Sequence, residues 1–260
     1  MTDAIRLQVQ SPLAEIILDK PEKRNALSVE MWAAIPDLIA AATQDSNISI
    51  VVIHGGASGA FAAGADISEF AEIYATPESA AASGRTIAQA LNTVETCPKP
   101  VLAAIDGACV GAGVSLAMAA DLRIASASAR FGITPARLGL VYPAGDTRRL
   151  LAAIGPGAAK DLLFTGRIVG AEEALSMRLI DRLVDTPTAI EAARALAGDI
   201  ASVSQWSTRA IKAMIAGLSN GWADDSDNAQ ALFLEGFSNA DFEEGRDAFL
   251  QKRPAKFTIR

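Results

Sequence analysis

Hydrophobic and polar positions along the first two thirds of the chain alternate between two kinds of pattern. Continuous apolar runs of about five residues, bounded by turn residues, are typical of strands that are covered on both faces of a sheet. A shorter pair of apolar stretches near the start, separated by Ser11-Pro12, predicts two strands joined by a turn. The strands predicted in this way cover 5–9, 13–18, 50–53, 101–105, 122–125 and 179–184.

Helical periodicity fills the segments between these strands. Ser28 is a suitable N-cap for a helix that ends near Thr43, and Pro77 opens a long helix over 77–96. A short helix is expected at about 113–120, and from about residue 187 onward the pattern is helical only. Strands that alternate with helices predict an α/β fold. We expect a core domain over residues 1–200 and a helical region over 201–260.

Composition narrows the class of protein. Half of the 260 residues are apolar and a fifth are charged, which allows a substantial core. The net charge of −7 disfavours nucleic acid and anionic lipid as partners, so an anionic ligand would need a local basic cluster. No segment is long and apolar enough to cross a membrane, and the first residues lack the order of a signal peptide.

The two cysteines and the single histidine exclude further classes of functional site. Cys97 and Cys109 form no CxxC motif, and we expect two reduced, buried thiols in a cytoplasmic protein. His54 is the only histidine, so a His-rich metal site is excluded and a Ser/His triad would need His54 itself. Its place at the end of an apolar run favours a strand-end residue. No metal is expected.

Two turns rich in Gly and Ala each follow a buried strand, the first at 61–67 and the second at 106–116. Small residues let the backbone approach a ligand closely, and Gly111 to Gly113 also open a helix with free N–H groups. Two such donors on one oxygen make an oxyanion hole, whereas composition alone equally fits ordinary tight turns. The second turn lacks the GxGxxG spacing of a dinucleotide site.

These turns belong to a series of motifs that runs in order along nearly the whole chain. Together they resemble the crotonase (enoyl-CoA hydratase/isomerase) superfamily. The motifs are Leu18-Asp19-Lys20-Pro21, Arg24-Asn25-Ala26-Leu27, Phe61-Ala62-Ala63-Gly64-Ala65-Asp66-Ile67, Lys99-Pro100-Val101 through Gly113, Leu116-Ala117-Met118-Ala119-Ala120-Asp121, Phe131-Gly132, Leu138-Gly139-Leu140, Leu163-Phe164-Thr165-Gly166 and 244–253.

The resemblance implies a spiral of ββα turns with a helical C-terminal trimerisation region, and a homotrimer or a dimer of trimers. It implies an acyl-CoA thioester as substrate, with CoA entering as part of that substrate and no other cofactor. It places the oxyanion donors at the N–H groups of Ala65 and Ala112. Residues expected to contact the CoA ester, some of them from a neighbouring subunit, are Arg24, Ala26, Ala63, Asp66, Ile67, Gly111, Tyr142, Lys256 and Phe257.

The chain departs from the resemblance at the acid–base positions. Enoyl-CoA hydratases of the family use two glutamates, and these positions align with Ser115 and Pro135. A third acidic position of some members falls at Pro143. Three side chains are candidates to replace them, each with an ordinary alternative. They are Asp146, otherwise a helix N-cap; Glu69, otherwise a solvated side chain; and Tyr142, otherwise a packing residue.

Three functions remain open at this point. The leading one is an acyl-CoA enzyme of hydratase/isomerase type, in which Ser115 and Asp146 handle water or proton transfer beside a stabilised thioester enolate. The second is decarboxylation or C–C cleavage of an acyl-CoA, which needs less acid–base chemistry. The third is a non-catalytic protein that binds CoA esters.

Overall fold

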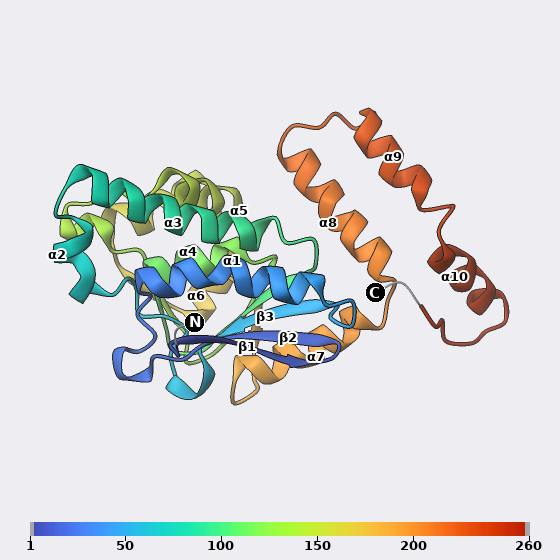
Figure 1. The fold of residues 1–260 in the computed structure, drawn as a ribbon, viewed down its shortest axis with the longest axis horizontal. Coiled ribbons are helices and arrows are strands. Elements are labelled where there is room, and N and C mark those ends of the chain that lie inside the picture. The colour runs from blue at the N-terminus through green and yellow to red at the C-terminus, as the bar shows by residue number, and fades with distance from the viewer. Residues whose placement is uncertain (1–2, 258–260) are drawn as a thin grey trace.

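The chain forms two sheets surrounded by helices in a computed structural model that describes residues 3–257 (Figure 1). The larger sheet has the strand order β1-β2-β3-β4-β6-β9, with β1 antiparallel to β2 and the others parallel. The smaller sheet has the order β5-β7-β8. The strands are β1 Ile5–Gln10, β2 Leu13–Leu18, β3 Ile50–His54, β4 Val101–Ile105, β5 Ala108–Val110, β6 Leu122–Ser126, β7 Arg130–Gly132, β8 Ile168–Gly170 and β9 Arg182–Val184.

Helices cover both faces of the larger sheet and extend into a separate C-terminal arm. The α-helices are α1 Val29–Gln44, α2 Phe70–Ile73, α3 Pro77–Glu95, α4 Ala112–Ala119, α5 Ala144–Thr165, α6 Ala171–Ser176, α7 Ala189–Ala201, α8 Gln205–Ser219, α9 Asp227–Glu235 and α10 Ala240–Leu250. Short 3₁₀ turns are η1 Pro21–Lys23, η2 Gly56–Ser58, η3 Ile67–Glu69 and η4 Pro135–Leu138.

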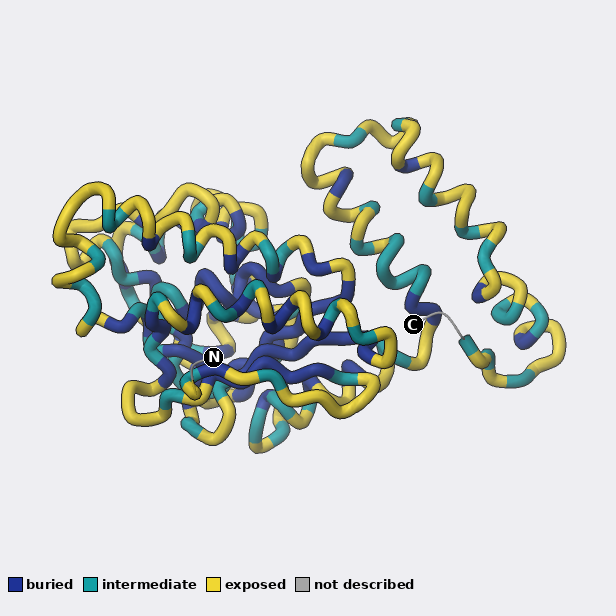
Figure 2. The backbone as a smooth tube through the Cα atoms, viewed as in Figure 1, coloured by how far each residue is buried: buried dark blue, intermediate teal, exposed yellow. Residues whose placement is uncertain are grey.

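The apolar strand runs are buried on both faces, as the pattern predicts (Figure 2). Alternate residues of a strand point to opposite faces of its sheet. Ile50 and Val52 pack with α7 residues on one face, whereas Val51 and Ile53 join the larger core beneath α1, α3 and α4. The parallel centre of the sheet therefore needs no polar face.

Local signals placed the first helices correctly. Ser28 caps α1, and its Oγ accepts a hydrogen bond from the N–H of Met31. Thr76 and Ser79 form a capping box at the start of α3, where Pro77 occupies the first helical position. The expected strand over 179–184 is wrong in its first half, because only Arg182–Val184 pairs with β6. Leu179 lies in the turn after α6, and its side chain packs in the core. Its apolar character therefore reflects burial and not a strand.

Helices α8, α9 and α10 form an arm that stands away from the sheets (Figure 1). Large apolar side chains are exposed along it, and Phe249 is 83% and Leu250 71% exposed. The division at residue 200 stays a prediction, although the helical-only pattern matches α7 to α10. Among residues 3–257, no helix has the length and apolar character needed to cross a membrane.

Candidate active site

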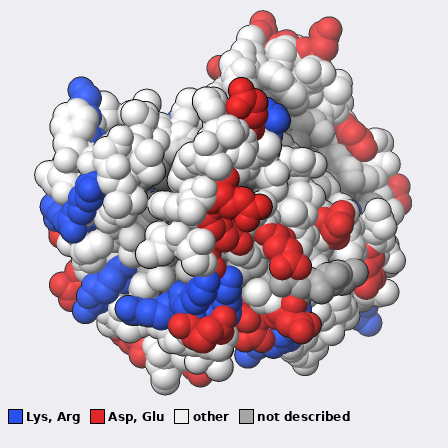
Figure 3. Space-filling model, turned by 60° about the vertical axis from the view of Figure 1, so that its left-hand side comes forward, with Lys and Arg blue, Asp and Glu red and all other residues white. Residues whose placement is uncertain are grey.

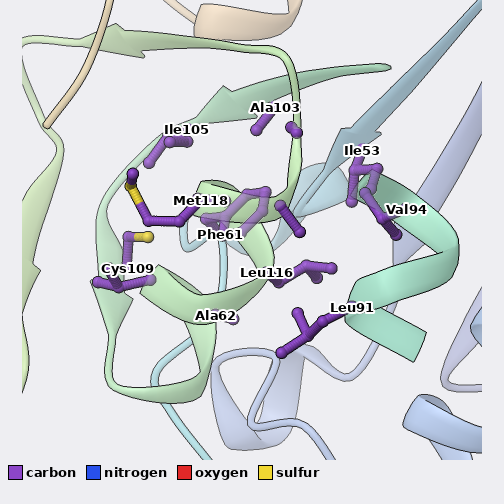
Figure 4. Close-up of a cluster of buried hydrophobic side chains, with 14 of the residues drawn as sticks. Ile53, Phe61, Ala62, Leu91, Val94, Ala103, Ile105, Cys109, Leu116 and Met118 are labelled. Carbon is purple, nitrogen blue, oxygen red and sulfur yellow. The ribbon is translucent and has the colours of Figure 1, made fainter. Parts of the chain in front are cut away.

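The two small-residue turns lie against each other. Ala62 pairs with Cys109 in an isolated parallel bridge. Its N–H donates to Ala108 O at 2.9 Å, and its carbonyl accepts from Val110 N at 3.0 Å. A Cβ added at Gly113 would lie 2.5 Å from Ala62 O, so only glycine allows this approach. Figure 4 shows Phe61 and Cys109 anchoring the two turns in the core around α4.

Each turn carries a backbone N–H group that has no acceptor in the described part of the chain. The bridge from Leu27 uses Gly64 O and Asp66 N, which leaves the N–H of Ala65 pointing away from Leu27. Ala112 is the first residue of α4, where an N–H has no intrahelical partner. Gly111 precedes it with a φ of 51°, which favours glycine. Both donors lie three residues beyond the paired Ala62 and Cys109.

A buried polar chain lies one helical turn beyond Ala112. Ser115 Oγ donates to Asp146 Oδ2 at 2.6 Å and lies 2.7 Å from the hydroxyl of Tyr142. Either hydroxyl can be the donor in the Ser115–Tyr142 bond, and the Tyr142 hydroxyl also donates to Gly111 O at 3.4 Å. All three side chains are at most 8% exposed. The structure thus joins Ser115 to two of the three candidates, Asp146 and Tyr142, but not to Glu69.

The environment of Asp146 favours its neutral form. Burial raises the pKa of this carboxyl, and the hydrogen bond from Ser115 and the charge of Arg149 only partly oppose it. Burial also raises the pKa of the Tyr142 hydroxyl, with a further contribution from Asp146. A buried carboxyl with a raised pKa is a suitable acid–base group near neutral pH.

The interpretation of Asp146 as a helix N-cap is wrong. Helix α5 begins at Ala144 with Pro143 as its N-cap, and no side chain caps it. Asp146 therefore lies inside the first turn, where its side chain points to Ser115 on α4. The packing interpretation of Tyr142 is incomplete, because its buried hydroxyl also bonds to Ser115. Pro135 begins η4 and, as a proline, brings no acid or base.

Glu69 is half-buried rather than solvated. Its Oε2 accepts a hydrogen bond from the N–H of Val29 at 2.9 Å and so satisfies one free donor of α1. Glu69 also lines a small cavity of about 40 Å³ beside Ala65. The other lining residues are Leu27, Val29, Trp32, Asp66, Phe70, Ile73, Tyr74, Ser83 and Ile87.

The residues expected near the adenine and pantetheine form one surface. Ala63 donates its N–H to Arg24 O at 3.0 Å, which joins the first turn to the segment of Arg24 and Ala26. Arg24 is exposed and Ile67 is 73% exposed, so both are accessible to a ligand. Lys256 and Phe257 lie against α10: the N–H of Lys256 donates to Glu244 Oε1 at 2.6 Å, and the ring of Phe257 lies beside Gly245. They therefore belong to the arm that stands away from the sheets (Figure 1).

Asp66 binds two lysine side chains, which is a structural role that the sequence did not predict. Its carboxylate is 3% exposed and accepts hydrogen bonds from Lys20 at 2.8 Å, Lys23 at 2.7 Å and Ser68. Burial alone would raise the pKa of Asp66, but these hydrogen bonds outweigh it and hold the pKa well below its ordinary value. On the face of the molecule shown in Figure 3, most Lys and Arg side chains lie toward the left and lower left of the view.

The enoyl-CoA hydratase/isomerase family profile matches residues 8–260. The crotonyl-CoA hydratase of Syntrophomonas wolfei is 33% identical over 257 residues, covering 97% of each chain. The short-chain-enoyl-CoA hydratase of Clostridium acetobutylicum is 32% identical, covering 95% of this chain and 94% of its own. A crystal structure of an enoyl-CoA hydratase/isomerase family protein from Hyphomonas neptunium is 66% identical, covers 99% of this chain and 98% of its own, and has a TM-score of 0.97.

The two-sheet architecture with a helical arm and the two paired turns define the crotonase class of α/β proteins. The chain belongs to the enoyl-CoA hydratase/isomerase family and is an acyl-CoA-processing member of it. The expectation of a crotonase fold is therefore confirmed.

Proposed function

We propose that this protein is an acyl-CoA enzyme that stabilises a thioester enolate and moves a proton through Asp146. The N–H groups of Ala65 and Ala112 donate to the thioester oxygen, on which negative charge develops. Each such donor contributes about 3–4 kcal/mol where one has been removed from other enzymes. The observation that carries the proposal is the Tyr142–Ser115–Asp146 chain beside these donors.

Proton transfer at the carbon next to the thioester follows from this arrangement. Ionised Asp146 accepts the proton, directly or through Ser115, while the enolate oxygen is held by the two N–H groups. The raised pKa of Asp146 brings its proton affinity nearer to neutral pH than that of an ordinary carboxyl. One carboxyl that takes a proton from one carbon and returns it to another suits double-bond isomerisation. Hydration additionally needs a water held by Ser115 or Tyr142.

Turnover of crotonyl-CoA and of a short 3-enoyl-CoA tests this function. We expect wild-type protein to convert at least one of them and Asp146→Ala to lose roughly 10²–10⁴-fold in kcat. Unchanged activity in that variant would remove Asp146 from the mechanism. Release of CO₂ from malonyl-type CoA esters would favour the decarboxylase alternative. Calorimetric binding of CoA esters without turnover of a broad panel would favour a non-catalytic binding protein.

We propose further that the protein assembles through its arm as a homotrimer or a dimer of trimers. The exposed apolar side chains of α8 to α10 are a surface that a second copy would cover. Such assembly would allow Lys256 and Phe257 of one subunit to reach the CoA site of a neighbour. The two buried, unpaired thiols at Cys97 and Cys109 fit the cytoplasm as the location.

A further inference from the structure

Arg149 is a buried cation placed directly behind Asp146. Its guanidinium is 4% exposed, and Nη1 lies 3.5 Å from Asp146 Oδ1, the carboxylate oxygen that does not face Ser115. The two residues are three positions apart on α5, so they share one face of the helix. The two oxygens of Asp146 are therefore divided between two partners, one the Ser115 hydroxyl and the other a fixed positive charge.

The far side of Arg149 is held by helix α3. Nε and Nη2 donate to Glu95 Oε2 at 3.0 and 2.7 Å, and Nη2 donates to Asn92 Oδ1 at 2.6 Å. A planar guanidinium with these partners has a single orientation, which a flexible ammonium would lack. Helix α3 thus fixes Arg149, and Arg149 in turn faces Asp146.

We propose that Arg149, anchored by Glu95 and Asn92, is a positioning residue that holds Asp146 with Oδ2 toward Ser115 and Tyr142. The inference rests on the proposed function, in which Asp146 carries the proton. Arg149 touches neither of the backbone donors nor Ser115 among the described contacts, so it acts through Asp146.

Glu95 has a second effect, because it limits how much of the charge of Arg149 reaches Asp146. The Glu95 carboxylate also binds Arg148 Nη2 at 2.8 Å. Burial raises the pKa of Glu95, but the hydrogen bonds from Arg148 and Arg149 outweigh it and lower the pKa. Ionised Glu95 therefore partly neutralises Arg149. Asp146 keeps a raised pKa although a guanidinium lies 3.5 Å away, because burial outweighs the charge of Arg149.

The groups that face Asp146 come from several elements, and each enters the expected pH dependence. These groups are Arg149 on α5, Ser115 on α4, Tyr142 before α5, Cys109 on β5 beyond Tyr142, and Glu95 on α3 beyond Arg149. Of these five, Arg149 and Glu95 carry charge at neutral pH. Removing Arg149 withdraws stabilisation from ionised Asp146, and neutralising Glu95 increases it. The two changes therefore have opposite signs.

Titration of the Asp146 carboxyl tests the inference without relying on activity. The protein is labelled with ¹³C at aspartate Cγ, and the Asp146 signal is identified by its loss in Asp146→Asn. We expect Arg149→Met to move this titration to higher pH and Glu95→Gln to move it to lower pH. Arg148→Met is the matched control, because Arg148 binds the same carboxylate, is 56% exposed and does not contact Asp146.

Kinetics supply the second readout. We expect Arg149→Met to lower kcat by roughly 10–100-fold with little change in KM, as for other lost orienting partners. The ascending limb of the kcat–pH profile should shift with the titration, and Arg149→Lys should recover part of the loss. Titration in Arg149→Met as in wild type, or an equal shift in Arg148→Met, would overturn the inference. Full activity in Asp146→Asn would instead refute the proposed function, while the carboxyl titration would still decide the role of Arg149.

Discussion

At the level of residues, the candidate site combines the free backbone N–H groups of Ala65 and Ala112 with one carboxyl, Asp146, whose place the sequence predicted only in part. The Ser115–Asp146 contact joins positions 31 residues apart on two helices. A local reading of Asp146 compares it only with its neighbours in the chain, where an acidic residue near a helix start resembles an N-cap. Pro143 is the local signal for the earlier start, because proline is common where a helix begins, and α5 begins at the next residue, Ala144.

The missed residues are those whose partners lie on other elements. The i,i+3 spacing of Asp146 and Arg149 was a visible signal for an ion pair on one helix face. Glu95 is 54 residues away from Arg149 and carries no such signal. By contrast, the assignment of the oxyanion donors to Ala65 and Ala112 rests on the resemblance and stays a prediction, because a backbone donor depends on the turn rather than on the side chain.

The Asp66 cluster yields a prediction about stability. Since its pKa is lowered in the folded state, ionised Asp66 stabilises the fold above its ordinary value of 3.8, and this contribution is lost as pH falls through and below that value. Asp66→Asn should therefore lower the free energy of unfolding at pH 7 by about 2 kcal/mol, with a smaller difference at pH 3.

Denaturant unfolding at both pH values and one protein concentration measures this difference. Asp19→Asn is the control, because Asp19 pairs with Arg6 on the surface with side chains 44% and 49% exposed. Such a pair contributes little to stability. A loss in Asp66→Asn that is as large at pH 3 as at pH 7 would contradict the role assigned to the carboxylate.

At the scale of elements, the paired turns and α4 form one unit. Strand and helix positions with strong apolar periodicity, such as β3, β4 and α1, were predictable because tertiary packing agrees with local preference. The segment before β9 was wrongly predicted as a strand, because buried apolar residues in a turn have the same pattern as a short strand.

Gly113 is the residue that lets α4 approach the first turn. A Cβ at this position would lie 2.5 Å from the carbonyl oxygen of Ala62, so Gly113→Ala must push the two turns apart. We expect a lower melting temperature and a loss of activity, because both proposed donors belong to these turns. Thermal unfolding and turnover of the same preparations measure the two effects.

The matched control is Gly84, which lies exposed within α3 with no atom within 4 Å of an added Cβ. Gly84→Ala should stabilise the protein by about 0.5–1 kcal/mol, because alanine loses less backbone entropy in a helix. If Gly113→Ala behaved like Gly84→Ala, close packing of the two turns would not be important for the site.

For the molecule as a whole, the crotonase architecture followed from the order of motifs, whereas assembly depends on contacts between chains. Phe249 and Leu250 on the arm are exposed, whereas large apolar side chains of the core are buried. If the arm joins subunits, Phe249→Asp should lower the molar mass in solution from that of a trimer or hexamer toward that of a monomer. Size-exclusion chromatography with light scattering gives this mass.

Val9→Asp serves as the control for assembly, because Val9 is 51% exposed on the edge strand β1 and not on the arm. It should leave the molar mass unchanged. A monomeric wild-type protein, or the same mass in Phe249→Asp as in wild type, would contradict assembly through the arm.

In the proposed function, the paired turns and Asp146 together remove a proton from the carbon beside a CoA thioester. Exchange of the α-protons of butyryl-CoA in D₂O, followed by NMR, tests this step whatever the final reaction is. We expect wild-type protein to catalyse the exchange, and Asp146→Asn to bind butyryl-CoA with similar affinity but exchange its protons at least about 100-fold more slowly. Exchange by Asp146→Asn at the wild-type rate would show that Asp146 does not remove the proton.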